Sequence, residues 1–395
     1  MGLNWNLKKW GIIALVVWML FTSGAYLATI ENEKESVSIL TRVNNDGSGI
    51  FLRSDVYDER QITIEDPEGW DGLVFMTPGP SSIQHMILSD IVKDKLGMNF
   101  IQRGTPSPGN AVSWTQMAPG NMVNYMFNSP EGRDIDGGIA WEPHYAVAIS
   151  GGKCKEVAET SSYWEGHPCC VVAASNTFLS NNEGAVQRFL AGYIKSVEWI
   201  NDVLSGDTGD EDYEWLLEKV IDIGTPKTTG SAQMSEDTAI SALENIQFAY
   251  EISNLAEQLA KVVETYKTLG IVNQQTLTDA GFETPLAFTE HLIQGQHLEG
   301  ASHENNTLKS PEELGYHGTG MTTIDVAYLA ADIHQIALHV GIDLGFYKEY
   351  GIHIRLNGPY GAGGDVMNAL LSRHSDLGFV GSPPVVSSSA NALRS

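Results

Sequence analysis

The chain has 395 residues, of which 42% are hydrophobic, so it is long enough for more than one domain. Its formal net charge is -26, with 49 acidic against 23 basic residues. Because such a surface repels nucleic acid and anionic lipid headgroups, the charge excludes both as binding partners. It favours solubility and does not identify a ligand.

The N-terminus carries an almost uninterrupted apolar run at residues 10–30, preceded by Lys8 and Lys9. A run of this length can span a bilayer. Two interpretations remain open, a cleaved signal peptide and an uncleaved membrane anchor, and the length of the run favours the anchor. Because Lys8 and Lys9 should stay inside, the rest of the chain is expected outside, anchored to the outer face of the cell membrane or secreted.

From residue 37 the sequence alternates short apolar runs with helical patterns. Strands are expected at residues 37–43, 49–54, 72–77, 98–103, 136–143 and 169–175. Helices are expected at residues 80–97, 116–128 and 182–202. Strands and helices that alternate at this length indicate parallel α/β layers.

The second half of the chain has three parts. Residues 210–270 are expected to be mainly helical, and one more helix is expected at residues 279–296. Residues 296–319 are polar and read as a linker. After it come strands at 322–330, 352–360 and 376–384, with helices at 332–351 and 361–374 and a last helix beginning at residue 385.

Cysteine appears at Cys154, Cys169 and Cys170. An odd count with two adjacent residues is not the framework of a disulfide-rich domain. No CxxC spacing and no neighbouring histidine pair accompanies them, so no metal site is predicted. Small buried hydrophobic side chains are the favoured state, and one bridge from Cys154 to either of the others stays open.

Several segments resemble sequences of one protein family. They are GFYKEYGIHIRL, GGDVMNALLSRHSDLGFVGSPP, VNNDGSGIFLRSD, GLVFMTPGPSSIQHMIL, DIDGGIAWEPHYAVAI, YWEGHPCCVVAAS and ALENIQFAYEIS. Together they resemble the nitrate/sulfonate/taurine-type (NitT/TauT, thiamine-pyrimidine-binding-like) family of periplasmic binding proteins. The resemblance covers most of residues 36–270 and 322–395, and it implies the type II periplasmic-binding-protein fold, two α/β lobes joined by crossover strands.

The order of these segments differs from the family's order, because the segment from GFYKEYG to SPP comes last instead of first. The chain therefore resembles a circularly permuted member, and termini that lie close together at a surface make permutation tolerable. The expected parts are the signal or anchor (1–30), the second lobe with crossover and C-terminal helices (36–300), a linker (301–321) and the first-lobe segment (322–395). A fragment of a tandem protein and a swapped lobe are the alternatives.

Two helix N-termini are candidate ligand contacts, because free backbone N–H groups and a partial positive charge suit an anion or a polar group. Ser81 and Ser82 precede the helix that starts near residue 83. Gly363 and Gly364 lie in a glycine-rich turn that lets the backbone approach a ligand. Ordinary capping and turn formation are the alternative explanation.

Polar residues also follow two strands of the last segment. Asp332, His334 and Gln335 come after the strand at 322–330, and Ser382 ends the strand at 376–384. Polar side chains at the carboxyl end of a strand suit a ligand-binding cleft. Capping of a helix by Asp332 is the alternative.

The remaining candidates lie in the second lobe and on the crossover. Trp141, Glu142 and His144 in WEPHYA combine an aromatic wall with a carboxylate, which suits an amine or an aromatic ligand. Packing of Trp141 in the core is the alternative. Asn44 and Asn45 lie on the proposed crossover, where they can bond either a ligand or the hinge backbone.

The resemblance implies a solute-binding protein that captures a small polar or anionic ligand of the nitrate, sulfonate, taurine or pyrimidine class and delivers it to an ABC permease with its ATPase. No catalytic residue and no cofactor is expected, since the chain has no GxSxG, HExxH or P-loop motif. No arginine falls in the segments expected to line the cleft, which disfavours an anion held by a guanidinium fork. A tethered extracellular sensor and an enzyme similar to thiamine-pyrimidine synthases are the alternatives.

Overall fold

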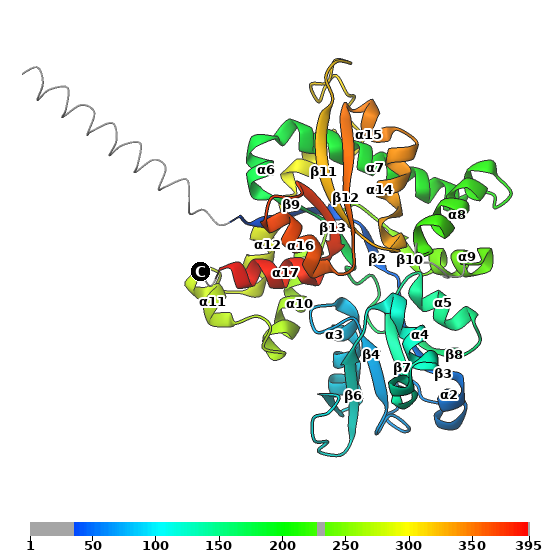
Figure 1. The fold of residues 1–395 in the computed structure, drawn as a ribbon. Coiled ribbons are helices and arrows are strands. Elements are labelled where there is room, and N and C mark those ends of the chain that lie inside the picture. Colours follow the sequence, from blue (N-terminus) through cyan, green and yellow to red (C-terminus); the bar gives the residue numbers. More distant parts are fainter. Residues whose placement is uncertain (1–34, 227–233, 394–395) are drawn as a thin grey trace, which may run out of the picture. The chain divides into compact units, whose positions relative to one another are not determined.

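The computed structural model describes residues 35–226 and 234–393 (Figure 1). The signal peptide or membrane anchor predicted at residues 1–30 lies outside these residues. Within the described part of the chain, no helix is both long enough and apolar enough to cross a membrane.

The first lobe is built on a five-stranded sheet with the order β1-β9-β13-β11-β12. β11 is parallel to β12 and to β13, whereas β9 is antiparallel to β13 and to β1. β9 is buried along its whole length, which explains its continuous apolar sequence. The strands are β1 (Val37–Arg42), β9 (Cys170–Ser175), β11 (Thr322–Leu329), β12 (Ile352–Tyr360) and β13 (Leu377–Gly381).

Helices cover both faces of this sheet (Figure 1). On one face, Phe189 and Tyr193 of α7 pack edge-on against Phe379, with ring centres 6.4 and 5.6 Å away. On the other face, α16 approaches the strand closely because Gly378 has no side chain; a Cβ there would lie 2.8 Å from Val366. The helices of this lobe include α7 (Glu183–Ser205), α14 (Ile336–Asp343), α15 (Phe346–Glu349), α16 (Gly363–Leu371) and α17 (Ser382–Ala392).

The second lobe is built on a six-stranded sheet with the order β5-β6-β4-β7-β3-β8. β4 is parallel to β6 and β7, and β3 is antiparallel to β7 and β8. Its strands are β3 (Ser48–Arg53), β4 (Val74–Thr77), β5 (Asn99–Gln102), β6 (Ala111–Gln116), β7 (Gly137–Trp141) and β8 (Cys154–Glu159). Its helices are α2 (Ser54–Arg60), α3 (Ile83–Asp90) with a π-helical extension (Ile91–Lys95), α4 (Pro119–Asn128) and α5 (His144–Ser150).

The chain crosses between the sheets at residues 43–48 and 160–169. In the first crossing, β2 (Asn44–Asp46) pairs with β10 (Ile246–Phe248), and Gly47, with φ 82°, leads into β3. The prediction that residues 210–270 are mainly helical is confirmed by α8 (Glu211–Gly224), α9 (Glu236–Glu244) and α10 (Leu255–Thr268), although β10 interrupts them. The other helices are α6 (Asn176–Asn181), α11 (Gln274–Asp279), α12 (Pro285–Leu292) and α13 (Gln296–Gly300).

Two sheets with helices packed on them confirm the predicted α/β fold with two lobes. Residues 322–393 contribute β11, β12 and β13 to the same sheet as β1 and β9, within one chain. The predicted domain boundaries and the circular permutation stay predictions.

Candidate ligand-binding pocket

A pocket of about 260 Å³ lies between the two lobes. Its wall in the first lobe comes from residues at or after the ends of β11, β12 and β13, and its wall in the second lobe from residues at or after the ends of β4, β6 and β7. These are the carboxyl ends of parallel strands, which is where open α/β sheets bind ligands. The pocket therefore has the position of a ligand site.

The wall in the second lobe includes Ser81, Ser82, Gln116 and Trp141. Ser82 caps α3, since its Oγ accepts from His85 N at 3.2 Å and donates to the Gly79 carbonyl at 2.8 Å. Ser81 is exposed. The indole Nε1 of Trp141 is buried and has no hydrogen-bond partner among the described residues. This wall can therefore offer a ligand an indole N–H and the hydroxyl of Ser81.

The wall in the first lobe includes Gly363 and Gly364, the first residues of α16. Ala362 precedes them and its side chain provides no cap. The first hydrogen bonds that return to Ala362 O come from the N–H groups of Asp365 and Val366. The N–H groups of the two glycines therefore precede the helical hydrogen bonds and can meet a polar ligand atom.

Asp332 and His334 form the buried part of the wall in the first lobe. Nδ1 of His334 lies 2.9 Å from Oδ1 of Asp332, and its Nε2 lies 3.0 Å from the carbonyl oxygen of Gly47. Oδ1 of Asp332 also accepts from the backbone N–H of His334 at 3.0 Å, so the capping role considered for Asp332 is confirmed.

The neighbours of His334 raise the pKa of its ring. Burial lowers the pKa of His334, but the neighbouring Cys169, Asp332 and Glu142 raise it more, to about 9. The pKa of the Cys169 thiol is lowered, mainly by its hydrogen bond with Cys170. The ring of His334 is therefore electrostatically coupled to Cys169 and to the buried Asp332 beside it.

Of the predicted site residues, the structure brings Ser81, Ser82, Trp141, Asp332, His334, Gly363 and Gly364 together around this pocket. The predicted residues that it places behind the wall are Gln335, Ser382, Asn44, Asn45, Glu142 and His144.

The residues behind the wall are engaged with the protein. Gln335 bonds Leu329 N and the Phe379 carbonyl, and thereby links β11 to β13. Ser382 donates to the carbonyl of Pro168 at 3.2 Å, and His144 packs against the ring of Trp141.

The crossover residues are also engaged with the protein. Asn44 accepts from Cys170 N at 3.2 Å, and Asn45 donates to Gln247 at 2.9 Å. Glu142 accepts from Asn245 Nδ2 at 2.9 Å and from Ala146 N at 3.0 Å. These side chains shape the crossover and the pocket wall.

Sequence reasoning missed Cys169, Cys170 and Gln116, which all line the pocket. The three cysteines are free and buried, and Cys154 lies on β8 in the other lobe. The sequence shows no histidine pair near the cysteines, but the fold brings one histidine, His334, next to Cys169 and Cys170. No spacing rule connects residues 164 positions apart, so the sequence held no signal for this contact.

Residues 13–211 match the model of the NMT1-like family, a span of half the chain. The chain belongs to the NMT1-like family. The matched span contains the second lobe, both crossings and the cysteine pair of this NMT1-like protein.

Three solved structures are similar to this NMT1-like protein. The ligand-binding component of an ABC-type import system from Staphylococcus aureus, with zinc bound, shares 15% identity at a TM-score of 0.43, covering 68% of this chain and 75% of that chain. The periplasmic nitrate-binding protein NrtA from Synechocystis PCC 6803 shares 13% identity at 0.41, with coverages of 77% and 76%. The aliphatic sulphonate-binding protein SsuA from Escherichia coli shares 12% identity at 0.40, with coverages of 60% and 65%. No curated protein matches the chain.

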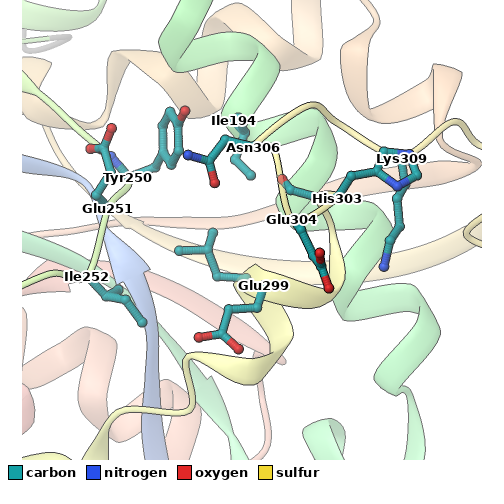
Figure 2. Close-up of a pocket in the computed structure, with 11 residues that line it drawn as sticks. Ile194, Tyr250, Glu251, Ile252, Glu299, His303, Glu304, Asn306 and Lys309 are labelled. Atoms are coloured by element: carbon teal, nitrogen blue, oxygen red, sulfur yellow. The ribbon is translucent and has the colours of Figure 1, made fainter.

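A second, larger pocket of about 670 Å³ lies beside α7 and α13 in the NMT1-like protein. Figure 2 shows Glu251 and Ile252 on one segment of its wall and Glu299, His303 and Glu304 on another. Within the described residues, no carboxyl end of a parallel strand lines it, and its lining includes three glutamates. We therefore place the ligand site in the smaller pocket between the lobes.

The buried Glu142 behind the pocket wall predicts a pH-dependent stability. Burial raises its pKa from 4.5 to about 7, and the bonds from Asn245 and Ala146 only partly oppose this. A carboxyl group whose folded-state pKa is raised costs stability as the pH rises from about 4.5 to about 7, and the full cost remains above that range. Glu142→Gln removes this cost.

The quantity to compare is the unfolding free energy of the wild type minus that of Glu142→Gln. This difference is expected to fall by about 2–3 kcal/mol between pH 5 and pH 8. Urea unfolding at both pH values measures this difference. The glutamine amide of the variant loses one hydrogen bond that the carboxyl group makes. This loss lowers the unfolding free energy of the variant equally at both pH values, so it cancels in the comparison. Glu68→Gln, on an exposed side chain, is the control. A wild-type-to-variant difference that stays constant with pH contradicts the prediction.

Proposed function

We propose that this protein is an extracytoplasmic solute-binding protein that captures a small polar or anionic ligand between its lobes and delivers it to an ABC permease with its ATPase. Membership of the NMT1-like family supports this function. The observation that carries it is the pocket between the lobes, lined from both sides by the carboxyl ends of parallel strands. Binding in such a pocket stabilises a closed arrangement of the lobes, because the ligand then contacts both walls.

The polar groups of the pocket fit a small ligand with hydrogen-bond acceptors. Donors are available from the N-terminus of α16 and from Trp141 Nε1. None of the described residues that line the pocket is an arginine or a lysine. Recognition would therefore rest on hydrogen bonds from backbone and indole N–H groups, which suits nitrate, bicarbonate, a sulfonate, taurine or a pyrimidine.

The location follows from the apolar run at residues 10–30, which would act as a signal peptide or an anchor. The protein would then meet its ligand outside the cell membrane. We assign it no catalytic residue.

A thermal-shift screen of the purified protein tests the proposed function. Nitrate, bicarbonate, taurine, alkanesulfonates and pyrimidines are added one at a time. A melting temperature that rises with the logarithm of one ligand's concentration identifies the cargo class. Turnover of any of these compounds would favour the enzyme alternative instead.

Two adjacent serines separate ligand binding from capping. Ser81→Ala is expected to weaken ligand binding by about 1–3 kcal/mol and to leave the unfolding free energy unchanged, because its exposed hydroxyl lines the pocket. Ser82→Ala is expected to lower the unfolding free energy by about 1 kcal/mol, because its hydroxyl caps α3. Calorimetric titration and urea unfolding measure the two effects. Equal affinity in wild type and Ser81→Ala would remove Ser81 from the site.

A further inference from the structure

Two cysteines and one histidine from distant segments meet at the wall of the pocket. Cys170 is the first residue of β9, Cys169 immediately precedes that strand, and His334 lies in the turn before α14. The Sγ atoms of the two cysteines and one ring nitrogen of the histidine all lie within 4.8 Å of one another. All three side chains are buried, and all three line the pocket.

The two sulfurs have the separation that a shared metal ion requires. Their Sγ atoms are 3.9 Å apart. Two Zn–S bonds of about 2.3 Å at the tetrahedral angle place the sulfurs about 3.8 Å apart. Side chains of adjacent residues within a strand normally point to opposite faces, and Cys169 can converge with Cys170 because it lies just before β9.

The backbone around the pair is fixed from several sides. Asn44 accepts the Cys169 N–H with its carbonyl and the Cys170 N–H with its side chain. The Ser382 N–H donates to the Cys169 carbonyl at 2.8 Å, and the Val43 N–H donates to the Cys170 carbonyl at 2.8 Å. These bonds fix the backbone that carries the two sulfurs before any ion arrives, which lowers the cost of binding.

His334 has the partner that metal-binding histidines usually have. Asp332 Oδ1 lies 2.9 Å from its Nδ1, and such a carboxylate orients the ring and makes the other nitrogen a better ligand. Nε2 lies 3.0 Å from the Gly47 carbonyl, so an ion at this nitrogen would replace that contact. Two sulfurs and one nitrogen are a ligand set that zinc accepts, with a fourth position left for water or a bound molecule.

We propose that Cys169, Cys170 and His334 bind a Zn²⁺ ion at the wall of the pocket, with the fourth coordination position open to the pocket. Asp332 is a positioning residue of this site. The ion would place a Lewis acid beside the donors of α16, and an oxygen or nitrogen of a pocket ligand could take the fourth position. The site is independent of which solute the protein carries.

The test uses the full chain, reduced and freed of metal with a chelator, and titrated with Zn²⁺ or Co²⁺ alone. One ion per chain is expected to bind. With Co²⁺, thiolate-to-cobalt charge-transfer absorption and the visible bands of tetrahedral cobalt are expected. Cys169→Ser with Cys170→Ser should abolish the charge-transfer absorption, and His334→Gln should abolish stoichiometric binding. Asp332→Asn should weaken binding about 10–100-fold.

Cys154→Ser is the matched control, because Cys154 is also a buried free cysteine but lies on β8 in the other lobe. It should bind Co²⁺ with the wild-type spectrum and stoichiometry. Circular dichroism and the unfolding midpoint show whether each variant is folded. Wild-type protein that binds no more Co²⁺ than the double cysteine variant, or a Cys154→Ser variant that loses the charge-transfer absorption, would overturn the site. Since the metal ion is the only probe, failure here leaves the solute-binding proposal standing.

Discussion

Gly47→Ala is expected to lower the free energy of unfolding by about 3 kcal/mol. Gly47 has a φ of 82°, where a residue with a side chain costs about 1–2 kcal/mol. A Cβ there would also lie 2.2 Å from Nε2 of His334 and 3.0 Å from Ile246 Cγ1. Overpacking of this kind costs about 1–3 kcal/mol more. Urea unfolding at one pH measures the loss.

Gly72→Ala separates backbone strain from the contact with His334. Gly72 has a φ of 81°, nearly the same as Gly47, but no atom lies within 4 Å of its ideal Cβ. The control is expected to lose about 1–2 kcal/mol, the strain alone. Equal losses in the two variants would contradict the account, since they would mean that the buried histidine moves away freely.

Gly47 couples the crossover to the pocket. The Gly47 carbonyl accepts the backbone N–H of Glu142 at 3.0 Å and lies 3.0 Å from His334 Nε2. One turn of the crossover thus touches residues of both lobes. A shift of Gly47 is therefore expected to weaken ligand binding as well as the fold.

Gly364→Leu is expected to leave the fold intact and to lower ligand affinity about 100-fold or more, a loss of about 2.7 kcal/mol. Gly364 lines the pocket near the start of α16, and no atom lies within 4 Å of its ideal Cβ, so a side chain there meets open space. Leucine also favours a helix more than glycine does. The new side chain would occupy volume that the ligand needs and would cover the free N–H groups.

Gly361→Leu is the matched control. It lies three residues earlier, its ideal Cβ also has no atom within 4 Å, and it does not line the pocket. Its affinity for the ligand identified by the screen is expected to equal that of the wild type. Calorimetric titration measures the ligand affinity of both variants. Wild-type affinity in a folded Gly364→Leu variant would place the ligand elsewhere.

Much of the fold could be predicted because its strands and helices have regular patterns. The apolar runs that became β4, β9 and β13 were located from composition alone. β8 was missed because its sequence, CKEVAE, is charged and half exposed. β6 was missed because its end is polar and partly exposed. The strand β10 interrupts a region predicted as helical, and its pairing with β2 could not be inferred from local sequence.

The candidate site was predicted in part, by the rule that polar residues after parallel strands meet at one edge. That rule found Asp332 and His334, and the argument from helix N-termini found Ser81. The strand-end rule does not predict where a side chain points within a turn. Glu142 was therefore expected on the pocket wall, but its carboxylate accepts a hydrogen bond from Asn245. The rule also gave no guide to β9, whose first residues reach the same edge only because the strand is antiparallel to β13.

The central claim is that the pocket between the lobes binds one small solute. The most direct test is calorimetric titration of the purified protein with nitrate, bicarbonate, taurine, an alkanesulfonate and a pyrimidine. The account predicts saturable binding of one compound, at one site per chain, that is lost in Gly364→Leu and kept in Gly361→Leu. Binding that is equal in the two variants, or a folded protein that binds none of the five compounds, would contradict it.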